Sequence, residues 1–399
     1  MESEERVDGQ RVAPRREWKA TRTSFTTEAG AERPQSAGSS GKAISFSSFS
    51  PVPLAEWDAA LVHSADRPLS DQLTDAEIAL LCRHLPKLEL HAHLSGSVLE
   101  STLRELCLAS GQDPSSSRFK LQSLSRHDSY EDTWRETVEA FETIRRLTAS
   151  DTQVLRRIAA EAVHFHADDG CVYFEMRTGL KKLPDRRTFL SELVSALKLA
   201  QAKYGLITRL LLSIDRGASV EDCKETVDIA IETFETQSKT IGGGMLVGVE
   251  MGGNPNRGDW VRDFEPHFIR ARRAGLKVSL HFAENKGCDD EHEAILAFRP
   301  DRVGHAVYMS KGVEERLLAQ KTPVEVCMTC HQAFYKVRPA DNVLGTLLEH
   351  GHPAILCCDN ACLLQTLPSN EYALAIKTFG LTARQVRSIV LEGARSIFY

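Results

Sequence analysis

The sequence predicts an α/β protein, a (β/α)8 barrel. Short apolar or β-branched runs alternate with longer amphipathic stretches along most of the chain, which is the repeat of a barrel of parallel strands. The runs are nearly continuous in apolar residues, as expected of parallel strands covered on both faces. Eight runs are expected to be strands: residues 88–94, 171–178, 208–215, 245–253, 277–284, 302–307, 323–329 and 353–359.

The stretches between these runs have the spacing of amphipathic helices. LTDAEIALLCRHLPK has helical spacing after Thr74, and several later helical stretches end at glycine, which commonly terminates helices. The first gap, 95–170, is long enough for an extra pair of helices after the first strand. One of this pair is expected to include SYEDTWRETVEAFETIRRLT.

The first part of the chain has a different composition. Residues 1–70 are rich in Ser, Arg, Glu and Gly and poor in aliphatic residues, so they cannot bury enough apolar surface to offset the entropy of ordering. We therefore predict a disordered N-terminal extension over 1–70 and a single barrel domain over 71–399.

The overall composition excludes several classes of protein. Hydrophobic residues make up 42% and charged residues 26%, as in a soluble globular protein, and the net charge of −6 gives no basic surface for nucleic acid. The sequence has no apolar run long enough to span a membrane and no secretory signal at its acidic start. Ten scattered cysteines indicate reduced thiols. We expect a cytoplasmic monomer without nucleic-acid or membrane partners.

Several predicted strands end in residues that can bind a metal. In KLELHAHLSGS, His91 and His93 lie at i and i+2 of a strand and share a face. His281 and Asp359 end the fifth and eighth runs, and the carboxyl ends of barrel strands meet at one rim. Each residue alone has a structural explanation, such as a core histidine or a helix N-cap. Together they predict a Zn²⁺ site, one ion per chain, with space for a water nucleophile.

A second metal is not favoured. The run 245–253 contains no lysine that could bridge two ions, although Glu250 leaves a bridging role open. CMTC at 327–330 has C-x-x-C spacing and lies at the end of the seventh run, not at a helix start. With Cys357, Cys358 and Cys362 it could form a thiolate metal site, but small buried thiols are the preferred interpretation.

Two further rim residues suit acid–base chemistry. Glu284 follows His281 by three residues and could act as a general acid and base, although alone it could be a solvated rim charge. His305 ends the sixth run and could orient or deprotonate a water molecule.

These motifs together resemble the adenosine deaminase family, and within it the adenosine deaminase-like branch that removes methylamine from N6-methyl-AMP. The resemblance runs from about residue 84 to 398 and its ordered set of motifs is highly specific. The motifs are ELHAHLSGS, YFEMRT, RLLLSIDR, VGVEMGGNPNRGDW, LHFAE, DRVGHAV, PVEVCMT and HPAILCCDN.

The resemblance implies a role for each matched residue. It implies that His91, His93, His281 and Asp359 hold zinc. It implies that Glu284 protonates purine N1 and that His305 assists the attacking water. The residues implied to contact substrate are His93, Ser95, Arg145, Thr178, Lys181, Asp215, Gly253 and Asn360, with the Gly253 backbone at the purine.

The residues near the expected substrate favour a nucleotide. Ser95 stands where related nucleoside deaminases carry an Asp, which would repel a 5′-phosphate, whereas a hydroxyl can donate to one. Lys181 and Arg145 match positions near the substrate and suit a phosphate, although each could be a surface cation. Asp215 is a plausible ribose partner.

The chain also departs from the family pattern. Asn360 replaces the second Asp of the last strand, Cys330 and His331 replace Ser and Asn, Ala306 replaces a glycine, and TGLK replaces the usual turn after the second strand. The leading hypothesis is a zinc-dependent deaminase that converts N6-methyl-AMP to IMP and methylamine. The alternatives are a deaminase of free adenosine and a catalytically silent purine-nucleotide-binding protein.

Overall fold

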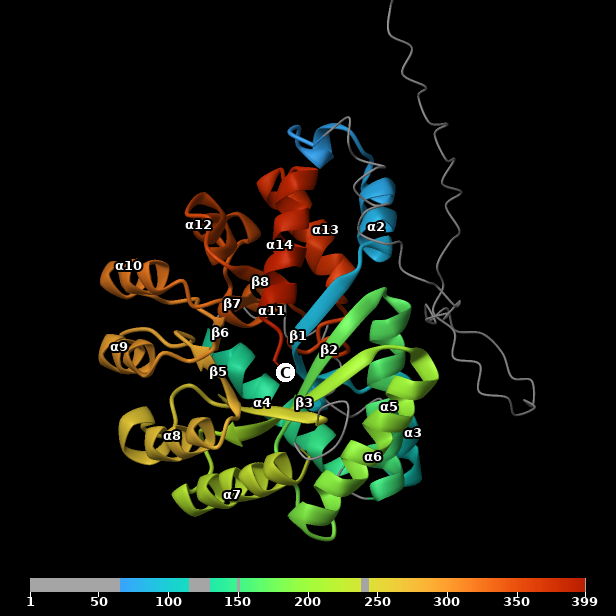
Figure 1. Cartoon of the computed structure of the whole chain (residues 1–399). Helices are drawn as coiled ribbons and strands as arrows, with labels where there is room; N and C mark the ends of the chain where they lie inside the picture. Colours follow the sequence, from blue (N-terminus) through green and yellow to red (C-terminus); the bar gives the residue numbers. More distant parts are fainter. Residues whose placement is uncertain (1–64, 115–129, 149–150, 238–243, 399) are drawn as a thin grey trace, which may run out of the picture. The chain divides into compact units, whose positions relative to one another are not determined.

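The computed structural model describes residues 65–114, 130–148, 151–237 and 244–398. In these residues eight parallel strands follow one another around a barrel in the order β1 to β8, with helices outside them (Figure 1). The predicted fold class is therefore confirmed. The predicted disordered extension lies outside the described residues over 1–64, and Leu69, near its end, is buried.

Each expected strand is present. The strands are β1 Lys87–His93, β2 Cys171–Thr178, β3 Ile207–Asp215, β4 Leu246–Gly252, β5 Lys277–Phe282, β6 Arg302–His305, β7 Val324–Val326 and β8 Ala354–Leu356. β7 and β8 are shorter than the runs that predicted them. The barrel closes beyond the end of β8, where Ala92 pairs with Asp359 and the Asp359 N–H donates to the His91 carbonyl at 2.8 Å.

The helices occupy the expected gaps. They are α2 Asp75–His84, α3 Glu100–Ala109, α4 Tyr130–Thr148, α5 Thr152–Asp168, α6 Arg186–Tyr204, α7 Val220–Gln237, α8 Glu265–Arg273, α9 Asp289–Phe298, α10 Lys311–Gln320, α11 Met328–Tyr335, α12 Val343–Glu349, α13 Pro368–Phe379 and α14 Ala383–Arg395. Short helical turns are η2 Leu69–Asp71, η3 Ser95–Ser97, η5 Trp260–Phe264 and η6 Pro339–Asp341.

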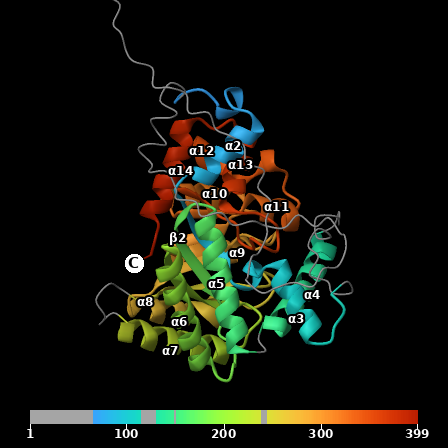
Figure 2. The ribbon, with the colours of Figure 1, turned by 90° about the vertical axis from the view of Figure 1, so that its right-hand side faces the viewer.

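Local sequence explains several of these boundaries. Thr74 forms a capping box with Glu77 at the start of α2, and Gly205, at φ 72°, terminates α6 in the left-handed conformation. The predicted extra helices after β1 are α3 and α4, which lie together beside the barrel (Figure 2). No described helix combines the length and apolar character that a membrane span requires.

The barrel interior contains an unusual number of charges. The side chains of Glu89, Glu175, Arg177, Glu250, Arg302 and Glu325 are completely buried. Arg302 donates to carboxylate oxygens of both Glu175 and Glu325, and Arg177 donates to Glu325 at 2.9 Å. Burial of charged groups is tolerated when they are paired and hydrogen-bonded, as Glu175, Arg302 and Glu325 are here.

The segment after α14 closes the end of the barrel opposite the carboxyl ends of the strands. Phe398 forms an apolar cluster with Leu211 and Val247. Its N–H donates to Glu175 at 2.8 Å, and the Arg302 guanidinium lies 3.5 Å from the centre of its ring. Phe398 therefore contacts two of the buried charged residues, Glu175 and Arg302.

Candidate active site

The four predicted metal ligands come together at the carboxyl ends of β1, β5 and β8. Ligand atoms of His91, His93, His281 and Asp359 all lie within 4.8 Å of one another. Nε2 of His93 is 3.2 Å from Nε2 of His281 and 3.4 Å from Oδ1 of Asp359. Strand register brings together residues that are far apart in the sequence.

The details of this cluster fit a metal ion. Nε2 of His91 is buried and has no hydrogen-bond partner among the described residues, although it points into the cluster. A Cβ on Gly304 would lie 2.8 Å from the His91 ring, and one on Gly252 equally close to the His281 ring. Three imidazoles and one carboxylate are a donor set that suits zinc.

Buried carboxylates hold the outer nitrogens of two ligands. Nδ1 of His91 lies 2.6 Å from Oε2 of Glu325, and Nδ1 of His281 lies 3.1 Å from Oε2 of Glu250. Such partners orient a metal-binding imidazole and fix which nitrogen faces the ion. Glu250, for which the sequence left a bridging role open, is completely buried beside His281, and the buried Arg177 pairs with Glu325.

The backbone is strained where the site residues leave their strands. Ala283, His305, Ala306 and Asp359 all have φ between 54° and 68°, a left-handed conformation that non-glycine residues rarely adopt. Strain of this kind concentrates at functional sites, where the surrounding structure enforces it.

The predicted acid–base pair is buried beside the metal ligands. Nε2 of His305 is 3.8 Å from Oε1 of Glu284, and the Tyr335 hydroxyl donates to the same oxygen. Burial raises the pKa of Glu284 above its ordinary value, against the opposing effects of His281 and Tyr335. A raised pKa favours a protonated carboxyl near neutral pH, which is the form a general acid needs.

Helix α11 corrects one prediction. CMTC follows the end of β7 as expected, but it also lies at a helix start, because β7 ends at Val326, Cys327 is the N-cap of α11 and the helix begins at Met328. The misplaced boundary concealed two functional candidates, His331 and Tyr335, which are four residues apart and therefore share a helix face. His331 contacts His305, and Tyr335 contacts Glu284.

The cysteines on these elements behave as small buried side chains. All ten cysteines of the chain are free thiols, and Cys327, Cys330, Cys357 and Cys358 are buried. Burial raises the pKa of the Cys330 thiol, which is hydrogen-bonded to Asp359. Among the described residues no potential metal-binding group contains two of these cysteines: Cys358 lies near Glu89 and His166, and Cys330 near His305 and Asp359.

The predicted phosphate-binding residues lie around α4. Nζ of Lys181 lies 3.3 Å from Oγ1 of Thr148, and α4, which carries Arg145, packs against η3, which begins at Ser95. Burial, followed by the nearby charge of Arg145, lowers the pKa of Lys181 to about 8. The positive charge of Arg145 is therefore near enough to influence Lys181.

The residues predicted at the ribose and purine differ in accessibility. Asp215 is exposed and its Oδ1 accepts the Gly217 N–H at 2.7 Å, whereas Thr178 is buried. Gly253 has φ 96°, and a Cβ there would lie 2.6 Å from Asp215. Asn360 is buried over Gly96, and its Oδ1 has no hydrogen-bond partner in the described part of the chain.

Comparison with known proteins identifies the family. Residues 86–399 match the family model described as adenosine deaminase. The chain belongs to the adenosine deaminase family. It is therefore a hydrolytic deaminase, and its site residues lie on the barrel rim expected for a (β/α)8 enzyme.

Two relatives of this deaminase are named for one activity. It is 30% identical over 337 residues to the human N6-methyl-AMP deaminase, covering 79% of this chain and 89% of that protein. It is 31% identical over 341 residues to the N6-mAMP deaminase of Arabidopsis thaliana, covering 79% and 92%.

Solved structures of the plant enzyme are also similar. A crystal structure of the Arabidopsis N6-mAMP deaminase superposes with a TM-score of 0.71 at 30% identity and covers 80% of this chain and 95% of that one. The same comparison with an Arabidopsis complex containing IMP gives a TM-score of 0.70 at 29% identity, with 80% and 93% covered.

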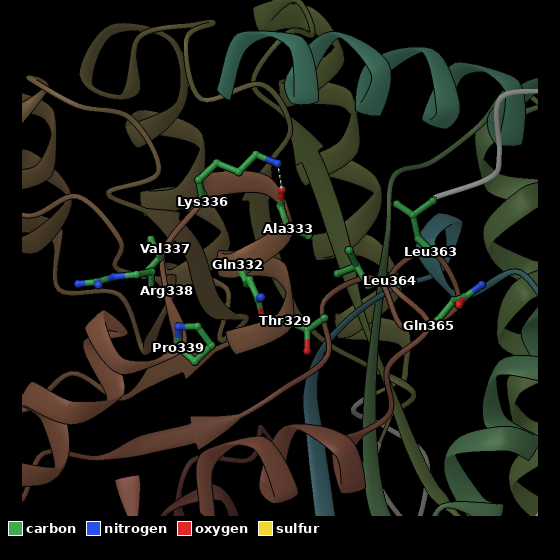
Figure 3. Close-up of a pocket in the computed structure, with 10 residues that line it drawn as sticks. All are labelled: Thr329, Gln332, Ala333, Lys336, Val337, Arg338, Pro339, Leu363, Leu364 and Gln365. Carbon is green, nitrogen blue, oxygen red and sulfur yellow. Dashed lines mark hydrogen bonds between the residues drawn. The ribbon is translucent and has the colours of Figure 1, made fainter. Parts of the chain in front are cut away.

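A separate pocket lies on another side of α11. It has a volume of about 500 Å³ and is formed by α11, the segment that follows it and the loop after β8 (Figure 3). Its lining includes Gln332, Lys336 and Leu364 but none of the predicted metal or acid–base residues. Nζ of Lys336 is hydrogen-bonded to the Ala333 carbonyl at 2.9 Å. This pocket is therefore distinct from the deaminase site.

Proposed function

We propose that this deaminase uses one zinc ion to convert a 6-(methyl)aminopurine nucleotide, with N6-methyl-AMP as the favoured substrate, to IMP and methylamine. The observation that carries the proposal is the buried Glu284 carboxyl beside a four-ligand cluster on one rim. Burial raises the pKa of Glu284, which favours a carboxyl that holds its proton beside this cluster.

The metal and the acid have separate tasks in this proposal. His91, His93, His281 and Asp359 would hold the zinc ion, which would supply the Lewis acidity that lowers the pKa of a water molecule. Glu284 donates its proton to purine N1, which makes C6 more electrophilic. Because Tyr335 donates to Oε1, the proton of Glu284 belongs on Oε2. Water adds its oxygen to C6, and the C6–N6 bond breaks. One water proton leaves with the 6-methylamino group as methylamine, and the other restores the Glu284 carboxyl, while N1 keeps the proton that Glu284 donated.

The nucleotide preference rests on the cations near α4. Lys181 and Arg145 can neutralise a 5′-phosphate, and Ser95 brings a hydroxyl where a carboxylate would repel one. The names of the human and plant relatives support the same substrate. A free nucleoside would leave the two cations without an anionic partner.

A product assay tests the proposal. Zinc-loaded protein is given N6-methyl-AMP, AMP and adenosine in parallel, and Lys181→Met is assayed beside wild type. We expect N6-methyl-AMP to be converted best and Lys181→Met to lower kcat/KM for the nucleotides by about tenfold or more without affecting adenosine, since one charge-assisted hydrogen bond contributes about 1.5–3 kcal/mol. Preferential conversion of adenosine would establish a nucleoside deaminase instead. Nucleotide binding without product would indicate a silent relative.

A further inference from the structure

Three buried side chains form a hydrogen-bonded row behind the acid–base pair. Nδ1 of His305 is 3.3 Å from Nε2 of His331, and Nδ1 of His331 is 2.9 Å from Nδ2 of Asn342. None of the three is more than 4% exposed. The row runs from the start of α12 through α11 to the end of β6.

The outer end of the row determines its direction. Oδ1 of Asn342 caps α12 by accepting the Leu344 N–H at 3.1 Å, so the amide nitrogen must face His331. An amide nitrogen can only donate, and therefore Nδ1 of His331 is an acceptor. Burial lowers the pKa of His331 to about 3, so its imidazole is neutral and its single proton lies on Nε2.

The same reasoning then applies to His305. The Nε2–H of His331 points to Nδ1 of His305, which must accept this hydrogen bond. A neutral His305 then carries its proton on Nε2, the nitrogen that lies 3.8 Å from Glu284. Donation from His331 is incompatible with a proton on Nδ1, whether His305 is the other neutral tautomer or the cation.

We propose that His331 is a positioning residue that fixes His305 as the Nε2–H tautomer, so that His305 faces the reacting groups as a hydrogen-bond donor rather than as a proton acceptor. The sequence left two roles open for His305, orienting a water molecule or deprotonating it. The hydrogen-bonded row assigns the first. The consequence for turnover rests on the proposed deaminase function, whereas the tautomer itself does not.

The tautomer can be measured directly. Full-length, zinc-loaded protein labelled with ¹⁵N-histidine is examined by long-range ¹H–¹⁵N correlation, and the signals of His305 are identified by their loss in His305→Gln. We expect a protonated Nε2 and an unprotonated Nδ1 in wild type. A protonated Nδ1 with an unprotonated Nε2, or two protonated nitrogens, would overturn the proposal whether or not the protein is active.

Variants test whether His331 is responsible. His331→Phe keeps a ring but removes the donor, and we expect His305 to lose its fixed tautomer and kcat to fall about tenfold with little change in KM. Asn342→Ala should act in the same direction if His331→Phe fails to fold. His352→Phe replaces another buried histidine, which bonds the Thr322 carbonyl at 2.7 Å, and is expected to keep the wild-type His305 signals and kcat. Unchanged His305 signals in both His331→Phe and Asn342→Ala would refute a role for His331.

Discussion

The two ends of this barrel bury similar groups in opposite ways. At the end closed by Phe398, the oxygens of Glu175 and Glu325 accept several hydrogen bonds, and Arg302 links the two carboxylates. At the rim, the buried Nε2 of His91 and Oδ1 of Asn360 have no hydrogen-bond partner in the described residues. The buried carboxylates at the closed end therefore have hydrogen-bond partners, whereas these two buried atoms at the rim do not.

The difference teaches how the fold separates stability from function. A buried polar network in which each member has its partners rigidifies a core, whereas a buried atom without a partner is costly unless something else satisfies it. Of these atoms, Nε2 of His91 belongs to the cluster that fits a metal. Glu325 belongs to both regions, since it binds Arg302 on one side and His91 on the other.

The largest effect is expected on turnover, from a substitution at the rim that removes the general acid and leaves stability unchanged. Glu284→Gln keeps the shape of the side chain but removes its exchangeable acid proton. We expect turnover to fall by about 10²- to 10⁴-fold, the usual contribution of a general acid, with the unfolding free energy nearly unchanged. Steady-state kinetics and urea unfolding of the same preparations measure the two quantities, and undiminished turnover would remove Glu284 from its role.

Removing a buried charge at the closed end is expected to change the free energy of unfolding by an amount comparable to the change in activation free energy expected for Glu284→Gln. Arg302→Leu leaves Glu175 and Glu325 buried without the cation between them, and loss of one partner of a buried pair typically costs about 3–5 kcal/mol. Urea unfolding of metal-free protein should show this loss. Arg187→Leu is the matched control, because the Arg187–Glu232 pair is 59% and 61% exposed and should contribute below about 1 kcal/mol. Equal effects of the two variants would contradict the comparison.

The two ring nitrogens of His166 show the same contrast between a hydrogen-bonded atom and a buried atom without a partner. Its Nδ1 bonds the Ala162 carbonyl at 2.8 Å, whereas its buried Nε2 has no hydrogen-bond partner in the part of the chain that the structure describes. Burial lowers the pKa of His166 to about 4. The unfolded chain therefore binds more protons than the native state below about pH 6.5, so this residue makes stability fall as the pH falls towards 4.

The His166 contribution can be isolated by substitution. Between pH 7 and pH 4, His166→Leu is expected to lose about 3 kcal/mol less stability than wild type. Urea unfolding of metal-free protein at several pH values measures the difference. Parallel curves for the two proteins would show that His166 is not held neutral by the fold.

The smallest effect is expected at Tyr335. Its hydroxyl has a hydrogen-bond acceptor in Glu284, although it lies at the rim, where other buried polar atoms have no partner. Tyr335→Phe removes the hydroxyl that donates to Glu284 and keeps the ring. We expect kcat to fall about tenfold, or roughly 1.4 kcal/mol, since the carboxyl keeps its burial but loses one partner that orients it. The kinetic measurement includes KM, because a change in KM alone would show that Tyr335 shapes the pocket instead of holding the acid.

Much of the site could be predicted because its residues follow local rules. Two histidines at i and i+2 of a strand share a face in any sheet, and barrel strands of one direction bring their carboxyl ends to one rim. The four candidate metal ligands, Glu284 and His305, which the structure brings together at one rim, were predicted in this way. Charged residues inside apolar runs, such as Glu325 in β7, were a signal that the strand pattern alone did not interpret.

The sequence by itself determined the alternation of strands and helices, the rim and the residues that can bind a metal, because these depend on spacing of a few residues. Only the tertiary structure decided which side chains form hydrogen bonds with these site residues. His91 and Glu325 meet across 234 residues, and Glu284 and Tyr335 across 51, through the closure of the barrel and the exact start of α11. Such pairings depend on the packing of whole elements, and a shift of one helical residue would turn His331 and Tyr335 away from the site.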